Sequence, residues 1–493
     1  MEKRVRRGAP LAAILGVALL LRLIALRSRG IWYDDAFSIF LVRQSWARIV
    51  AGTAADTMPP LYYFLLHLWR GLGEGVATLR LLNVIISLMT VALTYRLATL
   101  LFDGRTGLWA ALFVALSPFQ IYHAQELRMY AALCLNLLLY LYFLARLVRG
   151  VDRRPWVSWL GLALGGALAM YSHNLAIFTL LAADLFLLFK RRWGVLGRLL
   201  LAQLATGALV SPWLLLIPAQ VAKIQRAFWT PRPGLLEAVQ ALLTFHTNLP
   251  LPDPLIPPAL TAALLFLALV IYELARRHRR DAGVQLLAAF SLFPPSLLFA
   301  ASYLMRPLFV PRGLILSSIA YYTLGAVVVA RQPRRWLGGG LALLLVVPAL
   351  SALPGAYTFA AFPRSPYEQA VAFLRERVAA GDVVLHDNKL SYFPMHYYAP
   401  ELPQCFLPDE PGSPNDTLAP ASQEAMGIRP VESVEAATAG ASRLWFVYFT
   451  RAVEEYRAAG LPGHPLLDAL ASDWRQVEHV AFGDLEVCLF ERR

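Results

Sequence analysis

The sequence predicts a mainly α-helical, polytopic membrane protein over residues 1–354, followed by a small α/β domain over residues 355–493. Apolar runs of about 17–22 residues recur in the first part, and a helix of that length can cross a bilayer. Only 16% of the residues are charged, whereas soluble chains carry about a quarter. Residues 1–354 contain 34 Lys and Arg against 13 Asp and Glu, and residues 355–493 contain 11 against 19. This distribution is typical of membrane topology and argues against a nucleic-acid-binding surface, despite the net charge of +13.

The membrane part is predicted to contain about eleven transmembrane helices. Short basic clusters between them all fall on one side, which the positive-inside rule assigns to the cytoplasm. Residues 1–7 resemble the start of a signal peptide, but no convincing cleavage site follows, so an uncleaved first helix is expected. The N-terminus is then cytoplasmic, and an odd number of crossings places the C-terminal domain outside. The predicted segments lie near 11–27, 78–101, 107–122, 129–148, 156–171, 175–189, 199–218, 257–275, 283–304, 313–330 and 337–354.

Residues 28–77 form the first predicted outer loop and contain two candidate juxtamembrane helices. The stretch from Asp35 to Val50 is amphipathic, as in helices that lie in the membrane interface. A second short helix is expected from Leu61 to Trp69, because proline suits the first turn of a helix and two prolines precede this segment. The predicted membrane-facing side chains of the first helix are Phe37, Phe40, Leu41 and Trp46.

The pattern changes after residue 355 to short strands and helices. Residues 365–380 are apolar at helical spacing, and residues 451–459 form a second expected helix. Strands are predicted at 383–385 and 444–448, and a terminal hairpin at 476–482 and 485–490 around Gly483 and Asp484. Cys405 and Cys488 could pair if this domain is extracytoplasmic, or could stay as separate thiols, since sequence does not give their geometry.

Asp34 and Asp35 stand side by side in the stretch GIWYDDAF, residues 30–37, just after the first apolar segment. Carboxylates at a membrane boundary are costly unless they face water, a partner or a substrate. A solvated pair at a helix end is the alternative interpretation, but the flanking aromatic residues tie the pair to the interface. These two acids are therefore the first candidates for catalysis.

Glu126 and Arg128 lie in the stretch SPFQIYHAQELRMY, residues 117–130, at the predicted outer end of two apolar segments. Glu126 is one of only 13 acids in the first 354 residues. A local Glu–Arg ion pair is one interpretation, and such a pair contributes little when exposed. Arg128 could instead hold a phosphate through two hydrogen bonds.

His173, Arg306 and Arg312 lie in further predicted outer turns. A lone histidine is more often a structural hydrogen-bonding residue than a catalyst, and both interpretations of His173 are kept. The two arginines oppose the positive-inside trend, so they indicate either anionic lipid headgroups or a phosphate-bearing donor. No Cys or His spacing typical of a metal site occurs, and neither a metal nor another cofactor is expected.

Four motifs resemble those of bacterial family 39-type glycosyltransferases, which are relatives of protein O-mannosyltransferases and of the lipid A aminoarabinose transferase. WYDDA at residues 32–36 is similar to the family's opening W-x-D-E-A, and MPPLYY at 58–63 to its HPPLYY. Residues 117–130 are similar to its SPF-x-I-Y-Y-S-Q-E-A-R-M-Y stretch, and YSH at 171–173 to its Y-T-H. The order and spacing of the four agree, and the resemblance covers roughly residues 20–330.

The resemblance implies a GT-C fold, a polyprenyl-phosphate-linked sugar donor and an inverting transfer on the outer membrane face. Asp34 matches the family's catalytic aspartate, which implies a general base for the acceptor hydroxyl. Asp35 takes a position where the family usually has Glu, and Met58 one where it usually has His. Residues predicted to bind the substrate or the donor phosphate, from these motifs and from their positions, are Tyr62, Gln125, Glu126, Arg128, Tyr130, His173, Arg306 and Arg312.

The predicted function is therefore an integral-membrane glycosyltransferase of the bacterial cytoplasmic membrane, acting on a lipid, glycan or protein acceptor. A polytopic lipid or glycan transporter or flippase is the alternative, but transporters place charges near the bilayer midplane and often show repeated halves. A non-catalytic assembly subunit is a third interpretation, which gives no reason for the paired carboxylates. Membrane lipids are expected partners and nucleic acids are not.

Overall fold

A computed structural model describes residues 2–152, 154–226, 230–305, 307–413, 415–458 and 460–493. The chain divides into two compact units. The first, here called the helical unit, comprises Met1–Arg27 and Asp56–Tyr357. The second, the sheet unit, comprises Ser28–Ala55 and Thr358–Arg493. Part of the first predicted outer loop therefore belongs with the C-terminal residues.

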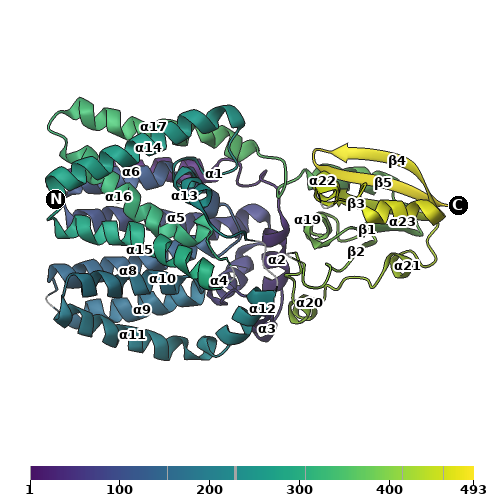
Figure 1. Ribbon diagram of the computed structural model, residues 1–493, viewed down its shortest axis with the longest axis horizontal. Helices are drawn as coiled ribbons and strands as arrows, with labels where there is room; N and C mark the ends of the chain where they lie inside the picture. Colours follow the sequence, from purple (N-terminus) through teal and green to yellow (C-terminus); the bar gives the residue numbers. More distant parts are fainter. Residues whose placement is uncertain (1, 153, 227–229, 306, 414, 459) are drawn as a thin grey trace. The chain divides into compact units, whose positions relative to one another are not determined.

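A helix lies over every apolar segment that the sequence predicts in the helical unit (Figure 1). The segment predicted at 107–122 is two helices, because Ser117 caps the second one at the backbone N–H of Gln120 and Pro118 takes its first position. Among the described residues, seven helices are long and apolar enough to cross a membrane by length and composition, so the count of eleven stays a prediction. The chain is a multi-pass membrane protein with these helices: α1 (Glu2–Leu23), α4 (Leu61–Trp69), α5 (Val76–Leu101), α6 (Gly104–Leu116), α7 (Pro118–Ala124), α8 (Tyr130–Arg149), α9 (Pro155–Ser172), α10 (Ala176–Phe189), α11 (Trp193–Leu214), α12 (Ile217–Arg226), α13 (Leu235–Thr247), α14 (Ile256–Glu273), α15 (Ala282–Leu304), α16 (Ile315–Arg331) and α17 (Arg335–Thr358).

Close helix packing and one buried arginine organise this bundle. Helices α8 and α9 pack so closely that a Cβ on Gly165 would lie 3.1 Å from the backbone nitrogen of Tyr140, which explains the glycine. Arg22 on α1 is fully buried. Its guanidinium donates to the Ser87 hydroxyl at 2.8 Å and to the Ala115 carbonyl at 3.0 Å. These bonds join α1 to α5 and α6, and they satisfy a charge that would otherwise be costly inside a membrane protein.

The sheet unit contains one five-stranded mixed sheet in the order β2-β1-β3-β5-β4. The strand β1 pairs in parallel with β2 and β3, and β5 pairs antiparallel with β3 and β4. The helix at 365–380, the two strands and the terminal hairpin predicted from sequence are confirmed, whereas β2 and several short helices were not predicted. The elements are β1 (Asp382–His386), β2 (Gln404–Phe406), β3 (Arg443–Phe449), β4 (Trp474–Phe482), β5 (Leu485–Arg492), α18 (Tyr367–Arg377), α19 (Lys389–Tyr398), α20 (Pro420–Met426), α21 (Val434–Ala437), α22 (Thr450–Ala458) and α23 (Pro465–Asp473) (Figure 1).

Each face of the sheet carries its own apolar core. On one face Val384 and Trp445 pack with Leu374 of α18 and Met395 of α19. On the other face, Leu385 of β1 and Leu444 of β3 pack with Leu470 of α23. Because successive residues of a strand point to opposite faces, the apolar runs in β1 and β3 serve both cores.

Cys405 and Cys488 do not form a disulfide, and both are free thiols. Cys405 lies on β2 and Cys488 on β5, with β1 and β3 between them in the sheet. Neighbouring strands lie about 4.8 Å apart, so the two Cα atoms are far beyond the reach of a disulfide.

Residues 28–55 form two helices, α2 (Tyr33–Val42) and α3 (Trp46–Ala55), where the sequence predicted one continuous helix. Three of the four side chains predicted to face the membrane lie in a protein core instead, whereas Trp46 is 45% exposed. Phe37, Phe40 and Leu41 are buried, and the Phe40 ring contacts Phe393 of α19 with centroids 5.7 Å apart. The amphipathic pattern is real, but its apolar face packs in a protein core. The helix predicted from Leu61 to Trp69 is confirmed as α4.

A buried histidine in β1 gives the sheet unit a pH-dependent stability. His386 is fully buried between the Ser391 hydroxyl and the Gln404 amide oxygen. Its pKa is lowered to about 3, mainly by burial and to a lesser extent by His396, whereas the Gln404 contact opposes the shift. The unfolded chain binds a proton near pH 6.5 and the folded chain does not, so stability is full above that pH and falls as the pH drops toward 3.

Because of His386, we expect the free energy of unfolding of the sheet unit to fall by about 1.4 kcal/mol for each unit that the pH drops between about pH 6 and pH 4. Hydrogen exchange of the β1 amides in the full chain, corrected for intrinsic rates, measures this slope. The His386→Gln variant should be less stable at pH 7 but should show a slope smaller by one proton. Equal slopes in the two proteins would contradict the assignment.

Candidate active site

The turn between α7 and α8, residues 125–129, contains three of the residues predicted to bind substrate, Gln125, Glu126 and Arg128. Gln125 is fully buried, and its amide donates to the carbonyl of Arg22 at 2.9 Å and to that of Ile24 at 2.7 Å. Gln125 thus fixes the turn to the end of α1. This contact is structural, and the implied role of Gln125 in substrate binding stays a prediction.

Glu126 pairs with a residue that the sequence analysis did not single out. Its carboxylate oxygen Oε2 lies 3.0 Å from Nδ1 of His123, and the two side chains are only 2% and 5% exposed. The local Glu126–Arg128 ion pair remains one interpretation, and the structure adds His123 as a partner of this carboxylate. The spacing of three residues across the end of α7 was the signal that could have identified His123.

Arg128 is held by a tyrosine of α4 and by an asparagine of α5. Its guanidinium donates to the Tyr63 hydroxyl at 3.0 Å, and only 5% of the residue is exposed. The amide of Asn83 donates to the Arg128 carbonyl at 3.0 Å, to the Tyr62 hydroxyl at 3.1 Å and to the Glu126 carbonyl. Asn83 was missed because nothing near it in the sequence marks a buried amide that supports a distant turn.

Tyr130 lies at the centre of an aromatic and cationic cluster. Its ring centroid lies 4.9 Å from that of His123 and 5.8 Å from that of His173, and the Arg312 guanidinium carbon lies 5.5 Å from it. The structure therefore brings Tyr130, His173 and Arg312 together beside the 125–129 turn. Arg306 lies outside the described residues.

His173, in the connection between α9 and α10, is neutral in this environment. Its pKa is lowered to about 3, first by burial and then by the nearby charges of Arg312 and Arg128. Its Nδ1 accepts the backbone N–H of Leu175 at 3.1 Å, which places the ring proton on Nε2. A neutral imidazole N–H beside two guanidinium groups can donate to an anionic oxygen without adding a third positive charge.

Asp34 and Asp35 belong to the sheet unit, in the first turn of α2. Asp34 is partly exposed. Asp35 is fully buried, and its Oδ2 lies 3.1 Å from the Arg364 guanidinium. The two neighbouring carboxylates therefore have different environments, one partly exposed and one buried.

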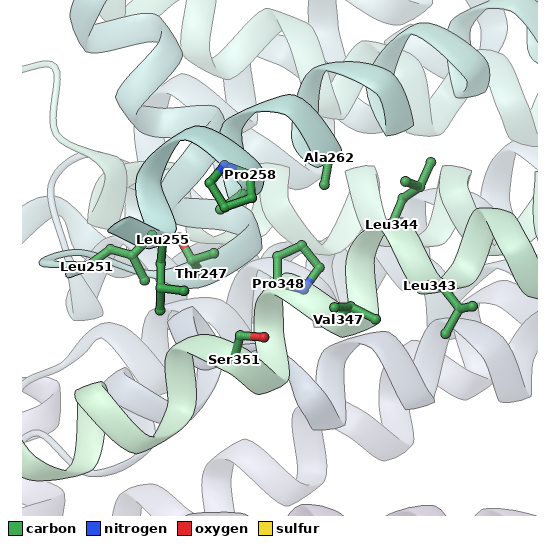
Figure 2. Close-up of a pocket in the computed structure, with 11 residues that line it drawn as sticks. Thr247, Leu251, Leu255, Pro258, Ala262, Leu343, Leu344, Val347, Pro348 and Ser351 are labelled. Carbon is green, nitrogen blue, oxygen red and sulfur yellow. The ribbon is translucent and has the colours of Figure 1, made fainter. Parts of the chain in front are cut away.

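An apolar cavity of about 310 Å³ opens between α13, the start of α14, and α17 (Figure 2). Among the described residues that line it, only Thr247 and Ser351 carry a hydroxyl, and leucine, proline, alanine and valine form the rest. Such a lining suits a hydrocarbon chain and does not suit a sugar or a phosphate.

A second cavity, of about 900 Å³, lies in the sheet unit beyond the carboxyl ends of β1 and β2. Open α/β sheets commonly bind ligands at this edge. Its described lining contains seven carboxylates and one arginine, Arg492, so it repels anions. A donor phosphate is therefore better suited to the cluster around Arg128 and Arg312 than to this cavity. The carboxylates are those of Asp387, Asp409, Glu410, Glu432, Glu435, Glu455 and Asp473.

Comparison with known proteins identifies the fold. Residues 57–216 match the family model described as dolichyl-phosphate-mannose-protein mannosyltransferase. ArnT from Cupriavidus metallidurans, in its apo state, is similar over 97% of both chains, with 14% identity and a TM-score of 0.63. The chain has the GT-C fold. The fold that the sequence motifs implied is thereby confirmed.

Two other GT-C enzymes extend the comparison. The Archaeoglobus fulgidus oligosaccharyltransferase is 12% identical with a TM-score of 0.51, over 96% of this chain and 74% of that one. The mycobacterial arabinofuranosyltransferase AftD is 14% identical with a TM-score of 0.52, over 98% of this chain and 40% of that one. No curated protein sequence matches the chain. The family match includes the 117–130 and 171–173 motifs but not Asp34 or Arg312.

Proposed function

We propose that this protein is a glycosyltransferase that moves a sugar from a polyprenyl-phosphate-linked donor to an acceptor hydroxyl or amine. The observation that carries the proposal is a cationic cluster within a GT-C fold, in which the buried Arg128 and the half-buried Arg312 lie near His173, and Arg312 lies against Tyr130. A structure of ArnT from Cupriavidus metallidurans contains undecaprenyl phosphate, and its TM-score to this chain is 0.63. A polyprenyl-phosphate-linked donor would bring a phosphate of the same kind to Arg128 and Arg312.

The proposed reaction is a single displacement. The Asp34 carboxylate takes the proton of the acceptor hydroxyl as that oxygen attacks the anomeric carbon, and the bond from this carbon to the phosphate oxygen breaks. The new bond forms opposite the one that breaks, so the anomeric configuration inverts. The leaving polyprenyl phosphate gains negative charge, and Arg128 and Arg312 stabilise it. An acid is not needed to protonate this leaving group, which suits the arginines.

The buried Glu126–His123 pair is proposed to support the acceptor side of the reaction. A carboxylate that is 2% exposed and held by a histidine keeps a fixed direction. It holds the His123 ring, whose centroid lies 4.9 Å from that of Tyr130, and so helps to shape the acceptor side. Tyr62 and Tyr63 are proposed to line the sugar and phosphate positions, since Asn83 and Arg128 hold their hydroxyls.

The apolar cavity beside α14 and α17 and the membrane-spanning helices suit a donor that stays in the bilayer. We propose that the protein lies in a bacterial cytoplasmic membrane with a cytoplasmic N-terminus, and that transfer takes place on the outer face. We also propose that transfer requires neither a metal nor another cofactor.

The test is an assay of purified protein in liposomes with a panel of labelled polyprenyl-phosphate sugars and a lipid extract as acceptor source. We expect one labelled sugar to move into a new product, with or without a chelator, and nucleotide sugars to give none. Loss of transfer with the chelator would contradict the metal-free proposal. Movement of labelled lipid between leaflets without a new glycosidic bond would favour the flippase alternative.

A further inference from the structure

The buried carboxylate of Asp35 holds an arginine from a distant part of the chain. Arg364, in the segment between α17 and α18, donates to Asp35 Oδ2 at 3.1 Å and to the Gly30 carbonyl at 2.5 Å. The two side chains are 0% and 2% exposed. The guanidinium carbon also lies 5.8 Å from the centre of the Trp32 ring. One arginine thus contacts residues before and after Asp34.

A second set of contacts holds the same segment. The backbone N–H of Ile31 donates to the Tyr398 hydroxyl at 2.8 Å, and the Tyr33 ring packs edge-on against Phe393 with centroids 5.1 Å apart. Both partners belong to α19 of the same unit. The residue on each side of Asp34 is therefore fixed, whereas Asp34 itself is partly exposed.

These contacts separate the roles of two adjacent acids. A general base must reach the proton that it removes, directly or through one water. Asp35 is enclosed and engaged by a guanidinium, so it is not placed to meet a substrate. Its contact with Arg364 does fix the first turn of α2, and with it the direction of the Asp34 side chain.

We infer that Asp35 and Arg364 are positioning residues that set the Asp34 carboxylate for proton removal. The inference rests on the proposed function, because it assigns Asp34 the role of base. It also gives Asp35 a reason to be acidic without being catalytic, and it makes Arg364 a determinant of the reaction.

The test compares Arg364→Ala, Asp35→Asn and Asp35→Glu in the full chain, with transfer kinetics and hydrogen exchange of residues 30–36. A displacement of about 1 Å in a catalytic group can cost about 100-fold, so we expect kcat to fall by that order in Arg364→Ala and Asp35→Asn. The KM for the donor should change by less than about threefold, because the base does not hold the phosphate. Exchange of residues 30–36 should rise, and Asp35→Glu, which keeps the charge, should recover part of kcat.

Arg443→Ala is the matched control. Arg443 makes an ion pair with the buried carboxylate of Asp382 at 2.6 Å in the same unit, on strands that carry none of the proposed site residues. It should lower the thermal stability of the sheet unit while kcat stays near the wild-type value. If both arginine variants lose activity only in proportion to unfolding, or if Arg364→Ala keeps full kcat, the inference is wrong. Wild-type protein without transfer would overturn the proposed function instead, and the exchange of residues 30–36 would still decide whether Arg364 holds the segment.

Discussion

Asp34→Asn is expected to lower the rate of sugar transfer by about 10²- to 10⁴-fold, the range that general-base catalysis contributes. The amide has nearly the same shape as the carboxylate but cannot take a proton. Asp34 lies in the first turn of α2 and is partly exposed, and the loss of its charge also weakens a favourable interaction with the helix N-terminus. Single-turnover transfer from a labelled polyprenyl-phosphate sugar measures the effect on the chemical step.

Glu74→Gln is the matched control for the loss of an acid. Glu74 lies in the same predicted outer loop as Asp34, is 46% exposed and pairs with Arg70 one helical turn away. Such a pair contributes little, so transfer and folding should be unchanged. The Asp34→Asn protein should still bind the donor, as seen by competition with unlabelled polyprenyl phosphate. Transfer at the wild-type rate by Asp34→Asn would remove Asp34 as the base.

Hydropathy predicted the helices of the helical unit well, because apolar side chains are favoured both where a helix faces lipid and where it faces the interior of the bundle. The break inside the segment predicted at 107–122 was encoded in the dipeptide Ser117-Pro118, which signals a cap and a first helical position. The sequence still predicted one segment, because the apolar run continues on both sides of these two residues. Local sequence thus contained the evidence for this break.

Residues 28–55 show a limit of a different kind. An apolar face formed by Phe37, Phe40 and Leu41 can lie on a membrane or in a protein core, and its periodicity is the same in both cases. The partner of this face is α19, more than 340 residues later in the chain. Only the tertiary structure identifies that partner, so no local pattern distinguishes the two environments.

The candidate site divides in the same way. Motifs identified Glu126, Arg128 and His173, whose neighbours in sequence carry the family pattern. They did not identify Asn83 or Arg364, because each acts through contacts with residues far away in sequence. Residues that touch the substrate leave a local signature, whereas residues that support them are recognised by burial and by unpaired hydrogen-bonding groups that need a partner.

Arg128→Ala is expected to raise the KM for the polyprenyl-phosphate donor by about 10- to 150-fold, the equivalent of the roughly 1.5–3 kcal/mol of a hydrogen bond to a charged group. Arg128 is buried and already oriented by Tyr63, so its guanidinium meets a phosphate with little loss of side-chain freedom. Steady-state kinetics with the donor and the acceptor varied separately measure the effect.

The same experiment distinguishes a phosphate-binding role from a general loss of structure. Polyprenyl phosphate, the product, should inhibit the wild-type enzyme and should lose inhibition in Arg128→Ala in parallel with the rise in donor KM. The KM for the acceptor should stay unchanged, and Arg128→Lys should recover only part of donor binding, because an ammonium group lacks the planar pair of donors. Arg70→Ala, which removes a half-buried arginine paired with Glu74 directly after α4, should leave both KM values unchanged. A rise in acceptor KM with an unchanged donor KM would place Arg128 on the acceptor side and would leave Arg312 and His173 as the phosphate ligands.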